Sequence, residues 1–291
     1  MQTISYAGLL VSMQANLRAS GQSGIHAAMA KPHVLAVAMQ KGGVGKTTTA
    51  INLSYEFHQA GLRTLLIDLD PQANATDGFG IVLADDDGTL FEALTSVRDE
   101  RMPLTDVIKP SEFGIDVAPA DDSMYKLDES GLGPGGENRL RVSLEAVADE
   151  YDVVVIDCRP SLGPLTISAL AAADDVIAVV SPGGPDELKG LTKLAETVYE
   201  AQDLLNPNVD IRHVILADYL GGSALAKGIR RNLERDWSEE YVGEISHTVR
   251  VGEAKDRRVP VAVHAPQSTA AADYRTAAKK LIDRIPTIEG Q

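Results

Sequence analysis

The sequence is poor in cysteine and has no long apolar run. Cys158 is the only cysteine among 291 residues, which excludes a disulfide framework and suits a reducing cytoplasm. No stretch approaches the ~20 consecutive apolar residues that a membrane-spanning helix needs. Residues 1–30 lack the basic start and apolar core of a secretory signal. Because 44% of the residues are hydrophobic, the composition favours a globular cytoplasmic protein with an ample core.

Positive charge is also scarce, and it is distributed unevenly. The chain has 27 Lys and Arg against 42 Asp and Glu, a net charge of −15. Residues 1–210 carry 14 basic against 31 acidic side chains, a net of −17, whereas residues 211–291 carry 13 against 11, a net of +2. The last third of the chain could therefore present a local positive face to an anionic partner such as DNA.

A glycine-rich loop lies between a predicted strand, Val34–Ala38, and a predicted helix whose apolar residues recur at helical spacing. The general phosphate-binding pattern G-x-x-x-x-G-K-[ST] requires a glycine where this chain has Gln40. The chain instead has a deviant form of this pattern, in which a second lysine, Lys41, lies five residues before Lys46. The candidate nucleotide-binding residues are Lys41, Gly42, Gly43, Val44, Gly45, Lys46, Thr47 and Thr48.

This loop has the chemistry that a nucleoside triphosphate requires. Its glycines allow backbone N–H groups to turn toward phosphate oxygens, and the start of the next helix favours negative charge. We expect Lys46 to reach the β- and γ-phosphates and the Thr47 hydroxyl to ligate Mg²⁺. The alternative is a glycine-rich turn that binds nothing, which the flanking strand and helix argue against.

Two further apolar strands end in carboxylates. The run from Arg63 leads to Asp68 and Asp70 before Pro71, and carboxylates at such strand ends lie beside the nucleotide crevice of an open α/β sheet. Taken alone, a solvated Asp-Pro turn would be the simpler interpretation. Residues 151–157 form the second run, which ends at Asp157 and is typical of a Walker B strand that holds Mg²⁺ through water.

Together these residues resemble the ParA/Soj family of partition ATPases, in the deviant Walker A group that also contains MinD and the nitrogenase iron protein. The resemblance covers Val34 to about Leu281 and is carried by the segments 40–53, 68–76 and 156–163. It implies one doubly wound, mostly parallel α/β sheet with helices on both faces. We expect an N-terminal extension over residues 1–32, containing a short helix and a linker, and one ATPase domain over residues 33–291. The nitrogenase iron protein is excluded because it uses two cysteines per subunit.

The resemblance also implies ATP and Mg²⁺ as ligands and a homodimer that sandwiches two ATP molecules. Lys41 would cross the dimer interface to the other subunit's phosphates, although a solvent-facing loop lysine is the alternative. Asp70 resembles the residue that orients the attacking water, and Lys46 would bind the phosphates. Thr47 would ligate the metal directly, Asp157 through water, and Asp68 would support the metal shell. Such an ATPase is expected to be slow until a partner stimulates it.

Arg159 stands where the family usually has proline. It could pair with a carboxylate at the interface, which we favour, or approach phosphate. The segment 246–255 resembles the family's Pro-Arg-Asn-Val-Arg segment, but Ser246 and His247 replace its Pro and first Arg. The candidates for DNA binding are Arg250, Arg230, Arg231, Arg257 and Arg258. For each of them the alternative is a solvated surface arginine without a partner function.

Four functions compete. The favoured one is segregation or positioning of a chromosome or plasmid by a nucleoid-associated cytoplasmic ATPase that binds nonspecific DNA and a ParB-like adaptor. A MinD-like protein would need a basic amphipathic tail, whereas residues 285–291 contain a proline and are not basic, so no stable membrane association is expected. A ParA-like positioner of another cargo stays open. Lys46, Asp70 and Asp157 argue against a nucleotide-binding module without turnover.

The remaining periodic segments alternate between strands and helices, which predicts the doubly wound sheet independently of the motifs. We expect strands at 114–119, 175–180 and 211–217. We expect helices at 89–96, 137–150, 186–205, 224–237 and 269–285.

Overall fold

The computed structural model describes residues 31–184 and 187–285. The predicted helix and linker in residues 1–30, and the tail at 286–291, lie outside the described residues. One sheet of eight strands runs through the structure in the order β3-β4-β2-β5-β1-β6-β7-β8. The strands are β1 (His33–Ala38), β2 (Thr64–Asp68), β3 (Lys109–Pro110), β4 (Asp116–Ala118), β5 (Val153–Asp157), β6 (Asp175–Val180), β7 (Asp210–Tyr219) and β8 (Tyr241–Ser246).

The sheet is parallel except for the antiparallel edge pair of β3 with β4. Its central strands β1, β2, β5 and β6 are buried along their whole length, which explains why their sequences are nearly continuous apolar runs. The doubly wound fold that the sequence predicted is confirmed.

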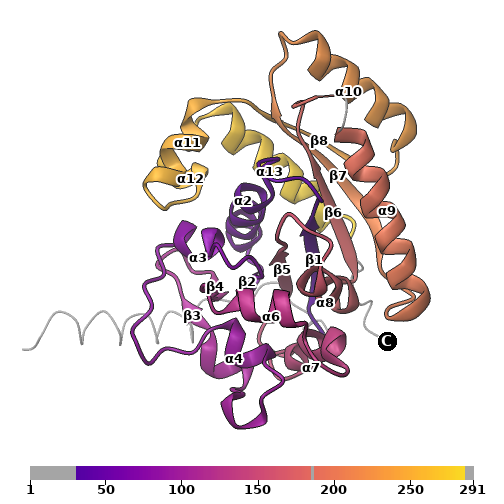
Figure 1. The fold of residues 1–291 in the computed structure, drawn as a ribbon. Helices are drawn as coiled ribbons and strands as arrows, with labels where there is room; N and C mark the ends of the chain where they lie inside the picture. The colour runs from indigo at the N-terminus through magenta and orange to yellow at the C-terminus, as the bar shows by residue number, and fades with distance from the viewer. Residues whose placement is uncertain (1–30, 185–186, 286–291) are drawn as a thin grey trace, which may run out of the picture.

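Helices cover both faces of the sheet (Figure 1). On one side α2 and α13 pack against each other and against strands, and on the other α8 and α9 pack on β1, β6 and β7. The helices are α2 (Lys46–Gln59), α3 (Asn74–Gly78), α4 (Leu90–Leu94), α5 (Leu104–Val107), α6 (Met124–Ser130), α7 (Arg139–Glu145), α8 (Pro164–Ala172), α9 (Glu187–Leu204), α10 (Ala224–Asp236), α11 (Val249–Asp256), α12 (Val261–His264) and α13 (Thr269–Ile282), with 3-10 turns at Arg98–Glu100 and Gly136–Asn138.

The predicted helix over residues 137–150 is wrong in its extent. The α-helix α7 ends at Glu145, and the backbone continues with i to i+3 hydrogen bonds, from Val147 N to Leu144 O and from Glu150 N to Val147 O. The regular α-helical pattern is therefore lost before β5 begins. The structure also contains elements that the sequence did not predict, among them α6, α8, β8 and α11.

The sheet topology places the carboxyl ends of β1, β2 and β5 side by side. β5 lies between β1 and β2, with Val37 of β1 level with Asp157 and Asp68 of β2 level with the same residue. In the strand order, β2 lies on one side of β1, whereas β6, β7 and β8 lie on the other side of β1. Such a reversal in strand order is where open α/β sheets bind ligands.

Candidate functional site

The predicted phosphate-binding loop joins β1 to α2. Gly43 and Gly45 adopt positive φ angles of 76° and 96°. A side chain at Gly45 would be strained, and its Cβ would lie 3.3 Å from the Cβ of Ala217. Gly45 precedes a helix of 14 residues, and no side chain caps the helix start. The backbone N–H groups of the first turn are therefore available to an anion.

Lys46 is the first residue of α2 and is only 6% exposed. Its Nζ donates a hydrogen bond of 3.1 Å to the backbone carbonyl of Lys41. Burial lowers the pKa of Lys46, while the nearby carboxylates of Asp157 and Asp70 act in the opposite direction. A buried ammonium at the start of this helix, held by a backbone carbonyl, is well placed to donate charge-assisted hydrogen bonds to a phosphate bound at the loop.

Asp157 ends β5 beneath this loop and is fully buried. Neither of its carboxylate oxygens has a hydrogen-bond partner of regular geometry among the described residues. Burial raises the pKa of Asp157 well above its ordinary value and the charge of Asp68 adds to this, while the Thr47 hydroxyl and Lys46 lower it. An orphaned buried carboxylate fits a hydrated cation, and a threonine hydroxyl is a suitable hard oxygen ligand beside it.

Residues 69–73, which we name the Asp70 loop, follow β2. Asp68, also fully buried, holds this loop: its Oδ1 accepts a hydrogen bond of 3.1 Å from Asp70 N, and its Oδ2 accepts bonds of 2.8 Å from the N and Oγ1 of Thr76. Burial raises the pKa of Asp68 to about 6 against these hydrogen bonds. The structure thus shows Asp68 hydrogen-bonded to the backbone of Asp70 and to Thr76, and its support of a metal shell stays a prediction.

A cavity of about 600 Å³ connects the two loops and extends along α2. It contains most of the predicted nucleotide residues together with Asp70. Its lining is Gly42, Gly43, Gly45, Lys46, Thr47, Thr48, Ile51, Asn52, Asp70, Gln72, Asn74, Asp77, Gly78, Pro160, Val251, Ala254, Lys255, Asp256, Arg258 and Val259. Lys41 is exposed at the start of the loop, outside this lining.

One wall of this cavity comes from α11 and the turn after it, which the sequence did not predict. Asn52 on α2 explains how that wall is held. Its Oδ1 accepts a hydrogen bond of 2.7 Å from Val261 N, and its Nδ2 donates one of 2.7 Å to Thr48 O. The only signal in the sequence is a polar residue within the apolar pattern of α2.

Residues 158–163, which we name the Asp157 loop, follow β5. Arg159 forms an ion pair with Asp128 on α6, and both side chains are largely buried, at 18% and 20% exposed. The structure therefore shows the ion-pair alternative for Arg159, with a carboxylate of the same chain. Pro160 faces the phosphate-binding loop, 3.8 Å from the position of a Cβ on Gly42. Nothing in the sequence marked Asp128 as part of the site.

The five arginines predicted for DNA binding lie on α10 and at the two ends of α11, which are well separated in Figure 1. Arg230 pairs with Glu234 at 2.8 Å and Glu244 at 3.1 Å, and Arg231 is exposed on the same helix. The remaining three show the following contacts: Arg250 pairs with Glu253 at 2.7 Å, Arg257 Nη1 lies 3.3 Å from His264 Nδ1, and Arg258 Nη2 lies 3.6 Å from Asp77 Oδ1 at the cavity.

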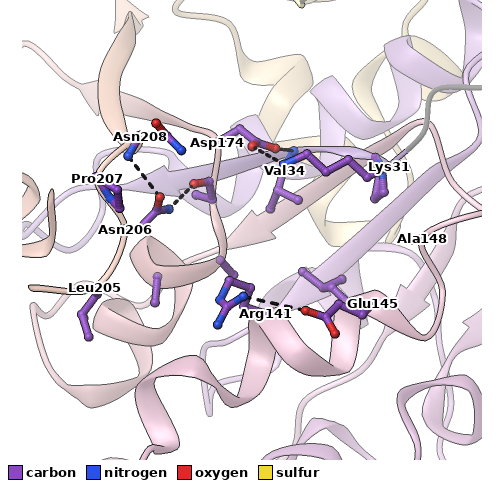
Figure 2. A pocket seen from close by; sticks show the side chains of 15 residues that line it. Lys31, Val34, Arg141, Glu145, Ala148, Asp174, Leu205, Asn206, Pro207 and Asn208 are labelled. Carbon is purple, nitrogen blue, oxygen red and sulfur yellow. Dashed lines mark hydrogen bonds and ion pairs between the residues drawn. The ribbon is translucent and has the colours of Figure 1, made fainter. Parts of the chain in front are cut away.

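A second cavity, of about 370 Å³, lies at the opposite edge of the sheet, where β1 and β6 begin (Figure 2). Its charged groups are paired with one another. Lys31 Nζ lies 3.2 Å from Asp174, and Arg141 lies 3.7 Å from Glu145. Its floor is apolar and includes Val34. Its lining contains none of the predicted nucleotide-binding or metal-binding residues.

Within residues 31–184 and 187–285, no helix is both long and apolar enough to cross a membrane. The same part of the chain contains no group of three or more His, Cys, Asp and Glu side chains that could hold a metal ion. A cation at Asp157 would therefore need oxygen ligands from the Thr47 hydroxyl, water or a bound phosphate.

Comparison with known proteins places the chain in a family. Residues 32–211 match a family described as an AAA domain. The chain is 37% identical over 258 residues to a chromosome partitioning protein ParA from Caulobacter vibrioides, covering 86% of this chain and 94% of that one. It is 36% identical over 252 residues to the sporulation initiation inhibitor protein Soj from Bacillus subtilis, covering 85% and 97%.

A solved structure is also similar. Cobyrinic acid a,c-diamide synthase from Mycobacterium smegmatis, solved with bound ADP and magnesium, superposes with a TM-score of 0.74 at 26% identity and covers 86% of this chain and 94% of that one. The order of the motifs, the deviant loop with Lys41 and Lys46, and the sheet topology agree with these similarities. The chain belongs to the ParA/Soj family of partition ATPases.

Proposed function

We propose that this protein is an ATPase that uses Mg²⁺, dimerises with ATP, and segregates or positions a DNA molecule with the help of an adaptor protein. The observation that carries the proposal is the buried Asp157 carboxylate beside Lys46 and Thr47, whose oxygens have no hydrogen bond of regular geometry within the described part of the chain. Leaving a buried carboxylate unsatisfied is costly, and a hydrated Mg²⁺ would remove that cost. The magnesium and ADP in the M. smegmatis relative support this assignment.

The residues around the phosphate-binding loop would each contribute to a different part of phosphoryl transfer. Backbone N–H groups of Gly43 to Thr48 and the Lys46 ammonium would hold the phosphates, and Thr47 and Asp157 would hold the metal, which neutralises charge on the phosphate oxygens. Asp70 lines the same cavity and would orient the attacking water. Its loop is fixed by Asp68, so the Asp70 carboxylate is held in place before the reaction begins.

Lys41 would act between subunits. Its side chain starts from an exposed position at the mouth of the loop, so a second copy of the chain can approach it. A lysine inserted from one subunit onto the phosphates of the other supplies positive charge where negative charge develops, as an arginine finger does. Binding of ATP would then drive dimerisation, and hydrolysis would release the two copies.

DNA binding would depend on the basic side chains of the last third of the chain. Arg250 is the best supported because it matches the family segment and is half exposed. Its pairing with Glu253 does not prevent phosphate binding, since exposed ion pairs contribute little and exchange readily. A ParB-like adaptor would complete the site, accelerate hydrolysis and release the DNA. The protein would then cycle on and off the nucleoid in the cytoplasm.

Co-sedimentation with nonspecific DNA tests the proposal. The protein is incubated with ATP and Mg²⁺, with ADP and Mg²⁺, and as Asp70→Ala with ATP and Mg²⁺. We expect DNA binding with ATP, little with ADP, and binding by Asp70→Ala equal to or stronger than that of the wild type, with hydrolysis lost. Asp77→Ala, which alters another acid of the same cavity, is the control. Equal binding with ATP and ADP would reject the switch, and binding to liposomes in place of DNA would favour a MinD-like function.

A further inference from the structure

Helix α6 contacts both catalytic loops, although it belongs to neither motif. Tyr125 and Asp128 are three residues apart and therefore lie on one face of the helix. The Tyr125 hydroxyl accepts a hydrogen bond from Nε2 of Gln72, in the Asp70 loop. Asp128 forms the ion pair with Arg159, in the Asp157 loop. One short helix thus contacts the loop that presents the water-orienting acid and the loop that follows the metal-binding acid.

The position of α6 is itself fixed. Met124 and Leu127, on another face of the helix, are 0% and 5% exposed and pack into the core. Lys126 lies over the ring of Phe91 on α4, with its Nζ 5.3 Å from the centroid. Removal of either apolar side chain from such a core would leave a cavity and destabilise the fold. The helix therefore provides a rigid support for the two loops.

The contacts continue to the catalytic carboxylates. In the Asp70 loop, Gln72 N donates a hydrogen bond of 3.0 Å to Asp70 Oδ1, so the Tyr125–Gln72 contact acts on the residue that holds Asp70. In the Asp157 loop, Arg159 follows Asp157 by two residues and precedes Pro160, which faces Gly42.

Buried polar atoms without a hydrogen bond of regular geometry concentrate at the same place. Nine such side-chain atoms occur among the described residues, and six of them belong to this loop, to Asp128 or to the end of β5. They are Asp128 Oδ1, Asp157 Oδ1, Asp157 Oδ2, Arg159 Nε, Ser161 Oγ and Arg159 Nη1, the last of which makes the ion pair with Asp128. An incompletely satisfied polar cluster is sensitive to small displacements, because each lost contact in a low-dielectric interior is expensive. The Arg159–Asp128 pair is therefore suited to transmit a movement between the loop and α6.

We propose that α6 couples the Asp70 loop to the Asp157 loop, so that Arg159 and Tyr125 are positioning residues for the water-orienting Asp70. This proposal rests on the proposed ATPase function. Loss of the ion pair would free the Asp157 loop from α6 and also loosen the Tyr125–Gln72 contact. Asp70 would then be misplaced although its own contacts with Asp68 are unchanged.

Hydrogen exchange tests the coupling without any enzymatic assay. The full chain and its Arg159→Met and Arg159→Lys variants are compared without nucleotide, with Arg141→Met as the matched control from the ion pair at the opposite edge of the sheet. We expect Arg159→Met to accelerate exchange at amides of residues 69–76 about 3-fold or more, and Arg159→Lys to restore the wild-type rate. A change confined to residues 157–163 and α6, or an equal change in Arg141→Met, would overturn the coupling even if the protein hydrolyses ATP.

A double-mutant cycle on ATP hydrolysis tests the consequence. Tyr125→Phe and Arg159→Met should each lower kcat about 3- to 30-fold with the affinity for ATP unchanged, and the double variant should lose less than the product of the two factors. Asp128→Asn, which keeps the shape of the side chain, should behave as Arg159→Met. Losses of kcat that multiply in the double variant would show that the two residues act independently. An affinity for ATP that falls together with the melting temperature would show that their role is merely structural. If the wild type showed no hydrolysis, the proposed function would fail, and the exchange experiment would still decide on the coupling.

Discussion

The buried Nζ of Lys46 donates a hydrogen bond of 3.1 Å to the backbone carbonyl of Lys41. The two lysines of the deviant loop are thus joined through the side chain of Lys46 and the backbone of Lys41. The ammonium of Lys46 therefore lies against the loop backbone, where the charges of Asp157 and Asp70 raise its pKa against the effect of burial. The side chain of Lys41 starts from the exposed rim. We therefore expect replacement of Lys46 and replacement of Lys41 to have different effects on ATP binding and on dimerisation.

Replacement of Lys46 by alanine should lower the affinity for ATP by about 10- to 100-fold, because charge-assisted hydrogen bonds to the phosphates are lost. The measurement is equilibrium titration with a fluorescent ATP analogue in the presence of Mg²⁺. Lys255→Ala removes a lysine from the same cavity and should change the affinity less than 3-fold. Equal losses in the two variants would contradict a specific role of Lys46.

Replacement of Lys41 by alanine should leave the affinity of the monomer for ATP within about 3-fold and abolish the proposed ATP-dependent dimer, since the contact proposed for Lys41 is to the phosphates of the other subunit. Light scattering of the wild type, Lys41→Ala and Lys227→Ala with ATP and with ADP gives the mass directly. Lys227, an exposed residue of α10, is the control. A Lys41→Ala protein of dimer mass with ATP would remove the proposed role.

Asp70→Ala should lower kcat for ATP hydrolysis at least 100-fold while nucleotide affinity is retained, because a water-orienting carboxylate acts in the transition state. The assay is phosphate release at saturating ATP. Asp77→Ala, an acid of α3 in the same cavity, should retain hydrolysis within a few fold. Loss of affinity in Asp70→Ala, with kcat intact, would assign the residue to binding instead.

Ionisation of Asp68 should make stability depend on pH. Its pKa in the fold is about 6, above the ordinary 3.8, so the folded state holds a proton that the unfolded state has released between pH 4 and 6. Stability therefore falls as the pH rises through this window, by up to about 3 kcal/mol for a rise of about two pKa units. Urea denaturation of the wild type and Asp68→Asn at pH 4 to 7 measures it. Parallel pH profiles would contradict the assignment.

Arg250→Ala should weaken ATP-dependent DNA binding about 3- to 10-fold and reduce its dependence on salt, because a phosphate contact releases counterions. Arg230→Ala should have a smaller effect, since Arg230 is already held by Glu234 and Glu244. Binding is measured with one DNA fragment at several salt concentrations. A larger loss in Arg230→Ala would assign the DNA surface to α10.

The fold and the centre of the site could be predicted because they depend on local patterns. Buried parallel strands require continuous apolar runs, and Asp68 and Asp157 follow two of them directly. The phosphate-binding loop needs glycines at fixed places because two of its residues have positive φ. Each of these signals is contained in a short segment, either the loop at residues 41–48 or an apolar run and the carboxylate that follows it, so no tertiary contact was needed to recognise it.

The outer parts of the site could not be predicted, because they depend on contacts between distant segments. Asp128 lies 31 residues before Arg159 on a helix without any motif. Arg258, predicted to bind DNA, lines the cavity beside the phosphate-binding loop together with residues of α2 and α11. Asp68, predicted to support the metal shell, accepts hydrogen bonds from Thr76, eight residues later. Neither contact has a signal in the sequence.

The hydrogen bond from Val261 N to Asn52 joins residues 209 positions apart. The phosphate-binding loop is therefore translated 209 residues or so before the residue that fixes the opposite wall of its cavity. A nascent chain that has not yet reached Val261 has the loop without this wall, so the cavity is completed by a long-range contact and not by local folding.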